Sequence, residues 1–254
     1  MNLKIKILLS FSYIFFLMMV MLAVSACSDS FTDARDGQSY DIVKIGDQIW
    51  LAENLNFSGI VDVDAVSNGA ANPNVDEANP NVSATLATFC PDGDNRNCKK
   101  YGRLYTWEAA LKACPEGWQL PTRDDLMKLI AAAETSSGQP KVPSQTATAS
   151  DQPVVNKSGI ALKSTSGWFK KGNGSDAVHF NALPAGYMFA ADPSSESPVG
   201  KFDGIGGYAY FWASTTDADE PAFAHYLFLD FSSPVAEIKS FDKNSARSVR
   251  CIKK

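Results

Sequence analysis

The sequence has 254 residues, 45% of them hydrophobic and 20% charged, and its 23 basic and 28 acidic residues give a net charge of −5 at neutral pH. An acidic chain of this kind is not expected to bind nucleic acid, because that binding needs a positively charged surface. Removal of residues 1–26 would leave 21 basic and 28 acidic residues in 228, enough for one sizeable domain with insertions or for two small domains.

Residues 1–26 have the pattern of an export signal. Lys4 and Lys6 make a positive start, and Ile7 to Leu22 is an apolar run without charge. The run is shorter than the roughly twenty residues that span a bilayer, and small residues rather than basic ones follow it. We therefore predict a cleaved signal peptide and not a permanent membrane helix.

The sequence Val24-Ser25-Ala26-Cys27 predicts lipid attachment. A branched apolar residue, two small residues and a thiol form the pattern at which bacterial lipoprotein processing acylates cysteine, and the lipid chains would anchor the protein stably. The alternative is an ordinary signal cut near Ala26, which would leave Cys27 as an unpaired exported thiol. We expect a lipid-anchored protein of the cell envelope, at the outer membrane or cell surface, with residues 27–39 as a polar tether.

A β-hairpin is the first ordered element predicted after the tether. Tyr40 to Ile45 and Gln48 to Leu51 are rich in β-branched and aromatic residues, and Gly46-Asp47 between them is a turn dipeptide. This hairpin would open a single domain that covers residues 40–254.

Two stretches lack the composition of a core. Residues 58–88 contain many Asn, Asp, Ala and Val and two copies of Ala-Asn-Pro-Asn-Val, too few for a solenoid. Residues 135–157 contain three prolines and many Ser, Thr and Gln. We predict that both are irregular surface insertions.

Two helices are predicted between these insertions. The inward face of the first has apolar residues at intervals of three and four: Leu104, Trp107, Leu111 and Cys114. Pro115 would end that helix, and Thr122 with Asp125 forms a capping box at the start of the next. The apolar stripe of the second helix consists of Leu126, Leu129, Ile130 and Ala133.

Four cysteines remain once Cys27 is assigned to lipid: Cys90, Cys98, Cys114 and Cys251. An even number in an exported protein favours disulfides, and three pairings are possible. We favour Cys90 with Cys98, which flank a tight polar turn, and Cys114 with Cys251, which would tie a helix to the end of the chain. A zinc site is the alternative, but there is no Cys-x-x-Cys and both histidines are far from the thiols in sequence.

Short strands and glycine turns follow from Gly159 onward. Ala222 to Phe231, Val235 to Phe241 and Ser245 to Ile252 are predicted to form a closing antiparallel meander. The predicted fold class is therefore α+β, with two helices early and strands at both ends.

Aromatic residues in the glycine-rich part of the chain are the candidate ligand-binding residues. Flat rings stack on sugars, and glycines let a backbone approach a ligand. The alternative is that these aromatic residues belong to the core. The candidates are Trp168, Tyr187, Tyr208, Tyr210 and Trp212.

Other polar groups give weaker signals. Asp92 to Asn95 and Asp217 to Glu220 offer oxygen ligands of the kind that bind calcium, but Arg96 interrupts the EF-hand pattern, so solvated turns are favoured. His179 and His225 lie in no catalytic motif, and strand packing is favoured for both. A pair of glycosidase carboxylates would leave no recognisable spacing. No catalytic residue, metal site or cofactor is predicted.

Several stretches, in order along the chain, closely resemble one protein family. They are Ile45–Leu55, Tyr101–Ala110, Cys114–Pro121, Leu162–Trp168, Phe180–Gly186, Tyr210–Thr216 and Ser248–Cys251. Over about residues 40–254 they resemble the Fibrobacter succinogenes major paralogous domain, and both predicted insertions fall between them.

The family in turn resembles the C-type-lectin-like and formylglycine-generating-enzyme-like fold, which implies two helices packed on short antiparallel strands. In lectin-like domains a cysteine on a helix pairs with one on the last strand, which supports the pairing of Cys114 with Cys251. The calcium-site motifs Glu-Pro-Asn, Gln-Pro-Asp and Trp-Asn-Asp are absent. If all four thiols of the domain are paired, none is free for copper, so the resemblance supports neither calcium-dependent sugar binding nor oxidase chemistry.

The leading hypothesis from the sequence is an exported, lipid-anchored binding module. Its ligand is undefined, with carbohydrate or another envelope component as the candidates. The sequence is more consistent with a binding protein than with an enzyme. A polysaccharide-acting enzyme that uses Asp or Glu, and a structural envelope protein, are the alternatives.

Overall fold

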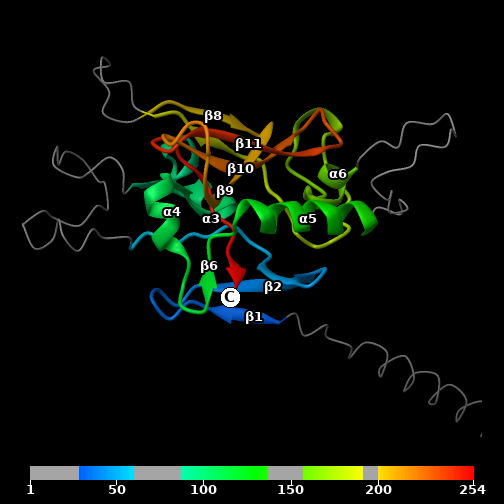
Figure 1. The fold of residues 1–254 in the computed structure, drawn as a ribbon, viewed down its shortest axis with the longest axis horizontal. Helices are drawn as coiled ribbons and strands as arrows, with labels where there is room; N and C mark the ends of the chain where they lie inside the picture. Colours follow the sequence, from blue (N-terminus) through cyan, green and yellow to red (C-terminus); the bar gives the residue numbers. More distant parts are fainter. Residues whose placement is uncertain (1–28, 60–86, 137–156, 191–199) are drawn as a thin grey trace, which may run out of the picture.

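The computed structural model describes residues 29–59, 87–136, 157–190 and 200–254. The predicted signal peptide, Cys27 and nearly all of the two predicted insertions lie outside these residues. The described part is α+β, as predicted, with helices packed on mostly antiparallel strands in two main sheets (Figure 1).

A five-stranded sheet joins the two ends of the described chain. In spatial order its strands are β1 (Ser30–Thr32), β2 (Ser39–Ile45), β3 (Gln48–Leu51), β13 (Ile252–Lys253) and β6 (Trp118–Gln119). The predicted hairpin is confirmed, because β2 and β3 pair antiparallel across the Gly46-Asp47 turn. Gly46 has a φ of 62°, a conformation that glycine adopts at little cost.

A six-stranded sheet forms the other half of the fold. Its spatial order is β11 (Ala236–Asp242), β10 (Phe223–Asp230), β9 (Tyr208–Thr216), β12 (Arg247–Ser248), β5 (Leu104–Tyr105) and β4 (Thr88–Phe89). A separate hairpin of β7 (Ala185–Met188) and β8 (Phe202–Ile205) contacts β9.

The predicted closing meander is right for two strands and wrong for the third. β10 and β11 pair antiparallel over their whole length. Residues 245–252, however, cross from one sheet to the other, with β12 in the six-stranded sheet and β13 in the five-stranded one. Every residue of 245–251 is buried, whereas the outer strand of a meander would expose alternate side chains.

Four helices and two short 3₁₀ turns complete the described residues. The elements are η1 (Pro91–Gly93), α3 (Asn95–Tyr101), α4 (Trp107–Ala113), α5 (Arg123–Ser136), α6 (Ser158–Leu162) and η2 (Phe169–Lys171). The predicted capping box is confirmed at α5. The Thr122 hydroxyl accepts from the Asp125 amide at 3.1 Å, and the Asp125 carboxylate accepts from the Thr122 amide at 3.0 Å.

The inward face predicted for the first helix is only partly correct. Leu104 belongs to β5, and Leu111 is 41% exposed. Because α4 begins at Trp107, a spacing counted from Leu104 does not continue through the helix, and its buried face consists instead of Trp107, Ala110 and Ala113 together with Ala109. The apolar stripe of the second helix is confirmed, since Leu126, Leu129 and Ala133 of α5 are fully buried.

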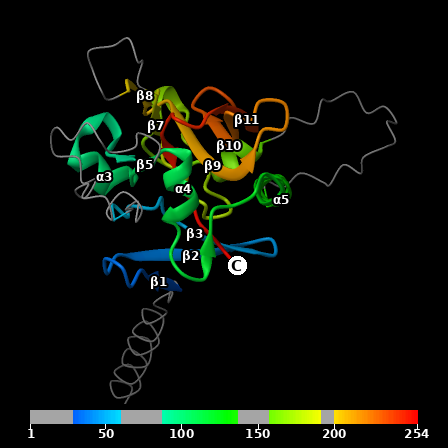
Figure 2. The ribbon, with the colours of Figure 1, turned by 60° about the vertical axis from the view of Figure 1, so that its left-hand side comes forward.

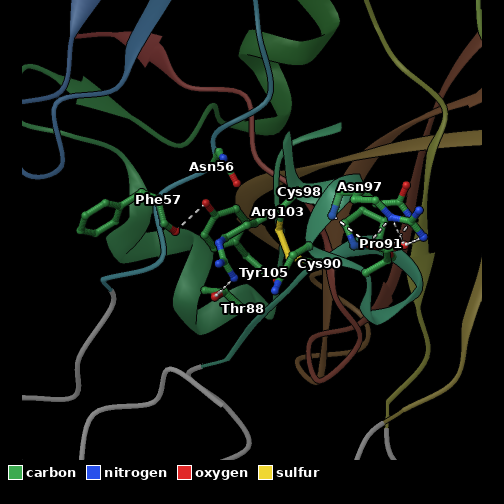
Figure 3. The surroundings of a disulfide bond; sticks show 12 residues. Asn56, Phe57, Thr88, Cys90, Pro91, Asn97, Cys98, Arg103 and Tyr105 are labelled. Atoms are coloured by element: carbon green, nitrogen blue, oxygen red, sulfur yellow. Dashed lines mark hydrogen bonds and ion pairs between the residues drawn. A yellow bond between two sulfur atoms is a disulfide. The ribbon is translucent and has the colours of Figure 1, made fainter. Parts of the chain in front are cut away.

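Both favoured disulfides are present. Cys90 and Cys98 join the start of η1 to α3 across eight positions (Figure 3). Cys114 and Cys251 join the end of α4 to the buried segment before β13, across 137 positions. The pairing favoured from the sequence is therefore confirmed, and the second disulfide links elements that are far apart along the chain.

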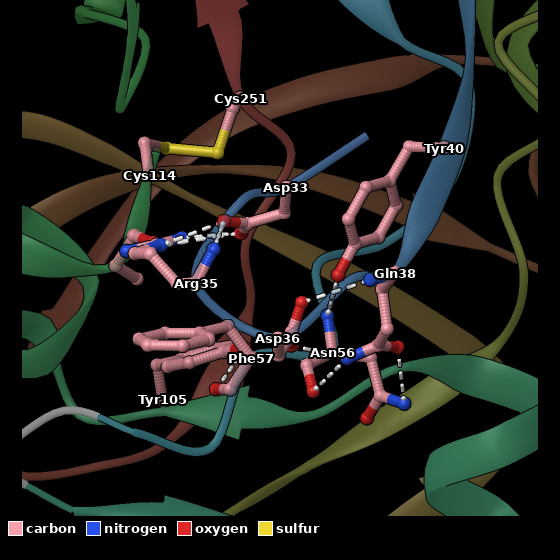
Figure 4. A network of polar contacts seen from close by, with 11 residues as sticks. Asp33, Arg35, Asp36, Gln38, Tyr40, Asn56, Phe57, Tyr105, Cys114 and Cys251 are labelled. Atoms are coloured by element: carbon pink, nitrogen blue, oxygen red, sulfur yellow. Dashed lines mark hydrogen bonds and ion pairs between the residues drawn. A yellow bond between two sulfur atoms is a disulfide. The ribbon is translucent and has the colours of Figure 1, made fainter. Parts of the chain in front are cut away.

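The prediction that residues 27–39 form a tether is wrong from Ser30 onward. β1 pairs antiparallel with β2, with Phe31 opposite Tyr40. Asp33 is fully buried and accepts two hydrogen bonds from the Arg35 guanidinium that are shorter than 3.0 Å (Figure 4). Burial alone would raise the pKa of Asp33, but the hydrogen bonds and charge of Arg35 outweigh it and lower that pKa. The polar composition of these residues suggested a tether, but they pack on the domain.

Candidate ligand-binding surface

The two faces of the six-stranded sheet differ chemically. One face packs against α5 and α6, which lie beside the sheet in Figure 1, and α5 is also seen there in Figure 2. The other face carries aromatic side chains from alternate positions, because successive residues of a strand point to opposite sides. These residues are Tyr208, Tyr210 and Trp212 on β9 and Tyr226 and Phe228 on β10.

Rings from neighbouring segments form a continuous row, named here the aromatic strip, which follows this face and continues past Tyr208 to Phe231, a ring that packs against the cluster on the α5 and α6 side. The strip is defined by six rings that are partly or largely exposed: Phe169, Tyr187, Phe189, Tyr208, Phe228 and Phe231. Four chain segments supply these rings: the one around Phe169, residues 187–189, β9 and residues 228–231. The strip therefore exists only in the folded protein.

Ring distances show that the strip is continuous. The Tyr187 centroid lies 4.6 Å from that of Phe189, and Tyr208 stacks on Phe228 with centroids 5.8 Å apart and planes inclined by 27°. The mostly buried ring of Tyr210 joins the two pairs, at 4.7 Å from Tyr187 and 5.1 Å from Phe228. Beyond Tyr208, Phe231 follows at 6.3 Å, and the 54% exposed Phe169 lies 6.4 Å from Phe231.

The five aromatic residues predicted to bind ligand fall into two groups. Tyr187 and Tyr208 belong to the strip, and Tyr210 lies directly beneath it. Trp168 and Trp212 are core residues, 6% and 0% exposed, and each indole N–H donates to a buried acceptor within 3.0 Å. The prediction is corrected for these two tryptophans, because neither offers a ring face to solvent.

The five candidates chosen from the sequence did not include the four phenylalanines of the strip. Phe228 could have been found, because it alternates with Tyr226 on a predicted strand. Phe169 and Phe189 lie in segments for which no particular strand was predicted, and Phe231 is the last residue of the predicted strand and does not alternate in phase with Phe228. Only the topology brings them beside β9 and β10.

A buried arginine lies behind the strip. The Arg247 guanidinium carbon is 4.4 Å from the ring centroids of both Trp212 and Tyr226 and 5.4 Å from that of Tyr210. Arg247 donates to the Ser245 hydroxyl and forms no ion pair with a described carboxylate. Burial lowers the pKa of Arg247 to about 10, so the group stays charged at neutral pH, where the electron-rich ring faces stabilise it.

A second arginine lies in the same segment, residues 245–252, which crosses from one sheet to the other and is called the crossing segment below. Arg250 is fully buried and donates to the carbonyl oxygens of Leu51 and Phe180 and to the side-chain oxygen of Asn54. Burial lowers the pKa of Arg250 to about 9. Two of these acceptors lie in residues 51–54 and the third is on Phe180, so Arg250 joins two segments that are far apart in the chain and is part of the interior, not of a ligand surface. Neither arginine was predicted from the sequence to have a structural or functional role.

Charged and hydroxyl groups accompany the rings of the strip. The Lys239 ammonium lies 4.1 Å from the Phe228 ring centroid and 2.6 Å from the Glu237 carboxylate, and that of Lys170 lies 5.7 Å from the Phe231 centroid. Lys170 has a φ of 48°, which is uncommon for a residue with a Cβ atom. The strip thus combines flat ring faces with groups that donate and accept hydrogen bonds, a combination that suits polar ligands with apolar ring faces.

The acidic stretches form turns. Asp94 caps α3 and pairs with Arg96 at 2.6 Å, and Asp217 accepts from the amides of Asp219 and Glu220. No group of three or more potential metal ligands is found among the described residues.

The two histidines occupy different settings. His225 lies in β10, opposite Ser240, in agreement with strand packing. The expectation is wrong for His179, which is exposed in a turn with a φ of 56°.

Two shallow pockets lie away from the strip. One of about 350 Å³ is lined by Leu111, Trp118 and Lys254 among others, beside the Cys114 disulfide. The second, of about 150 Å³, is lined by polar residues that include Glu53, Asn56 and Asn181. Neither contains a nucleophile with an adjacent base, so neither indicates a reaction.

These features define the chain as a disulfide-braced α+β domain with an exposed row of aromatic rings. The family model described as the Fibrobacter succinogenes major domain matches residues 43–253, and the chain belongs to this family. Comparisons with curated proteins and with solved structures find no match. Among the described residues no helix has the length and apolar character needed to cross a membrane.

Proposed function

We propose that the protein is an exported lipoprotein, anchored through Cys27, whose domain binds carbohydrate of its surroundings or of the cell envelope through the aromatic strip. The observation that carries the proposal is the row of six rings that are partly or largely exposed, with lysine, carboxylate and tyrosine hydroxyl groups beside it. Sugar rings present apolar C–H faces and polar hydroxyl edges, so they match both kinds of group.

The lectin-like resemblance is part of the same proposal. We propose the C-type-lectin-like fold for this domain because a disulfide joins the end of a helix to the last strand region, as in lectin-like domains. The sugar would be bound without the lectin calcium site, whose sequence motifs the chain lacks.

Tyr208→Ala is expected to weaken glycan binding about tenfold. A ring contact of this kind contributes on the order of 1.4 kcal/mol, which corresponds to that factor. The measurement is binding of the purified domain to an array of plant-wall and bacterial-envelope oligosaccharides, followed by titration of the strongest ligand. Phe228→Ala should give a loss of similar size, since the two rings stack.

Met127→Ala is the matched control, because Met127 is also an exposed hydrophobic residue, 47% exposed, but lies on α5 outside the strip. It should leave binding unchanged. Thermal unfolding of each variant would verify the fold. No glycan bound above background, or equal binding by wild type and Tyr208→Ala, would contradict the proposal.

The lipid anchor has its own test. The tryptic peptide that begins at Cys27 and ends at Arg35 should carry acyl chains in protein isolated from the producing cell, because lipoprotein processing cleaves before Cys27 and acylates it. Mass spectrometry of this peptide measures the modification. Cys27→Ser should abolish it, and an unmodified Cys27 in the wild type would refute the anchor.

A further inference from the structure

We infer that the β1 side of the five-stranded sheet faces the lipid bilayer and that the domain is held there in one orientation. The inference rests on the proposed lipid anchor at Cys27. It adds the surface that meets the membrane and the side that remains free for ligand.

The length of chain between lipid and domain is the first argument. Only Ser28 and Asp29 separate Cys27 from Ser30, the first residue of β1. Three residue steps span at most about 11 Å even when fully extended. Since the lipid on Cys27 lies in the bilayer, β1 must lie close to the bilayer surface.

The firm attachment of β1 to the domain is the second argument. Its backbone pairs with β2, and Phe31 packs on Trp118 with ring centroids 5.2 Å apart. A strand held in this way cannot swing as a tether would. The short link therefore restrains the whole domain and not only its first residues.

Asp33 and Arg35, which follow β1, attach the chain after this strand to the rest of the domain. Arg35 pairs with Asp33 at 2.7 Å and donates to the backbone oxygen of Ala113, at the end of α4, at 2.8 Å (Figure 4). Its guanidinium carbon also lies 3.7 Å from the ring centroid of Phe57. The segment after β1 is thus linked to two distant parts of the domain.

The positions of the strands determine which side of the domain is directed away from the bilayer. In both views of the ribbon β1 and β2 lie at one end of the domain, and β8, β10 and β11 lie at the opposite end (Figures 1 and 2). With β1 next to the bilayer, the elements around the aromatic strip are directed away from it. A ligand in the surroundings then meets the strip without competition from the anchoring membrane.

Energy transfer to a membrane dye tests the orientation. The full-length lipidated protein would be inserted in vesicles of phosphatidylethanolamine and phosphatidylglycerol that contain a lipid acceptor dye. Ala34→Cys, just after β1, and Lys201→Cys, just before β8, would carry the donor, since both positions are exposed. At least twofold more transfer from position 34 than from position 201 is expected.

A linker variant serves as the control. Twelve Gly and Ser residues inserted between Asp29 and Ser30 form a flexible chain of about 20 Å, which should reduce the difference between the two positions. Equal transfer from both positions in the uninserted protein, with vesicle binding intact, would overturn the orientation and leave the anchor standing. Absence of vesicle binding, with Cys27 unmodified by mass, would overturn the anchor and the orientation together.

Discussion

Replacing Cys114 and Cys251 together by alanine is expected to lower the free energy of unfolding by about 5 kcal/mol. The disulfide closes a loop of 137 positions, and the loss of chain entropy in the unfolded state increases with loop length. Urea unfolding followed by tryptophan fluorescence measures the change, because all five tryptophans are buried in the core.

The other disulfide supplies the comparison. Alanine at Cys90 and Cys98 opens a loop of only eight positions and should cost about 2.5 kcal/mol. Equal losses from the two double variants would show that local packing, and not the length of the closed loop, determines what these disulfides contribute.

Arg250→Met is expected to lower the free energy of unfolding by about 3–5 kcal/mol, because it leaves the acceptors on Leu51, Phe180 and Asn54 buried without a donor. Arg247→Met should cost less than about 2 kcal/mol. Methionine fills the same kind of space among the rings, and replacement removes the cost of burying a charge that has no carboxylate partner. Urea unfolding of both variants measures the difference.

These two variants are matched controls for each other, since both remove a buried guanidinium from the same crossing segment. If Arg247→Met were the more damaging of the two, the ring faces around Arg247 would contribute more than the carbonyl oxygens around Arg250. Arg247→Lys separates charge from shape, because lysine keeps the charge and loses the planar group.

Signals confined to a short stretch of sequence allowed correct prediction. The β2–β3 hairpin depends on a turn dipeptide between two apolar runs, and the start of α5 depends on Thr122 and Asp125, three residues apart. The disulfides were also predictable, because assigning Cys27 to lipid leaves four cysteines, of which two flank one polar turn.

Contacts between distant segments account for what could not be predicted. Asp33 and Arg35 belong to a polar stretch that resembles a tether, and their role depends on the backbone oxygen of Ala113. The burial of Trp212 likewise depends on an acceptor in β5, the backbone oxygen of Tyr105. Composition indicated aromatic residues as candidates but could not separate the exposed rings from the core rings.

The position of β13 has a consequence for the order in which the protein can fold. β13 lies between β3 and β6, so the five-stranded sheet has a gap at its centre until Ile252 is in place. The β2–β3 hairpin and β6 cannot be joined into one sheet before β13 has paired with both. Completion of the five-stranded sheet is therefore expected to be a late step in folding, because it requires contacts between residues that are far apart in the chain.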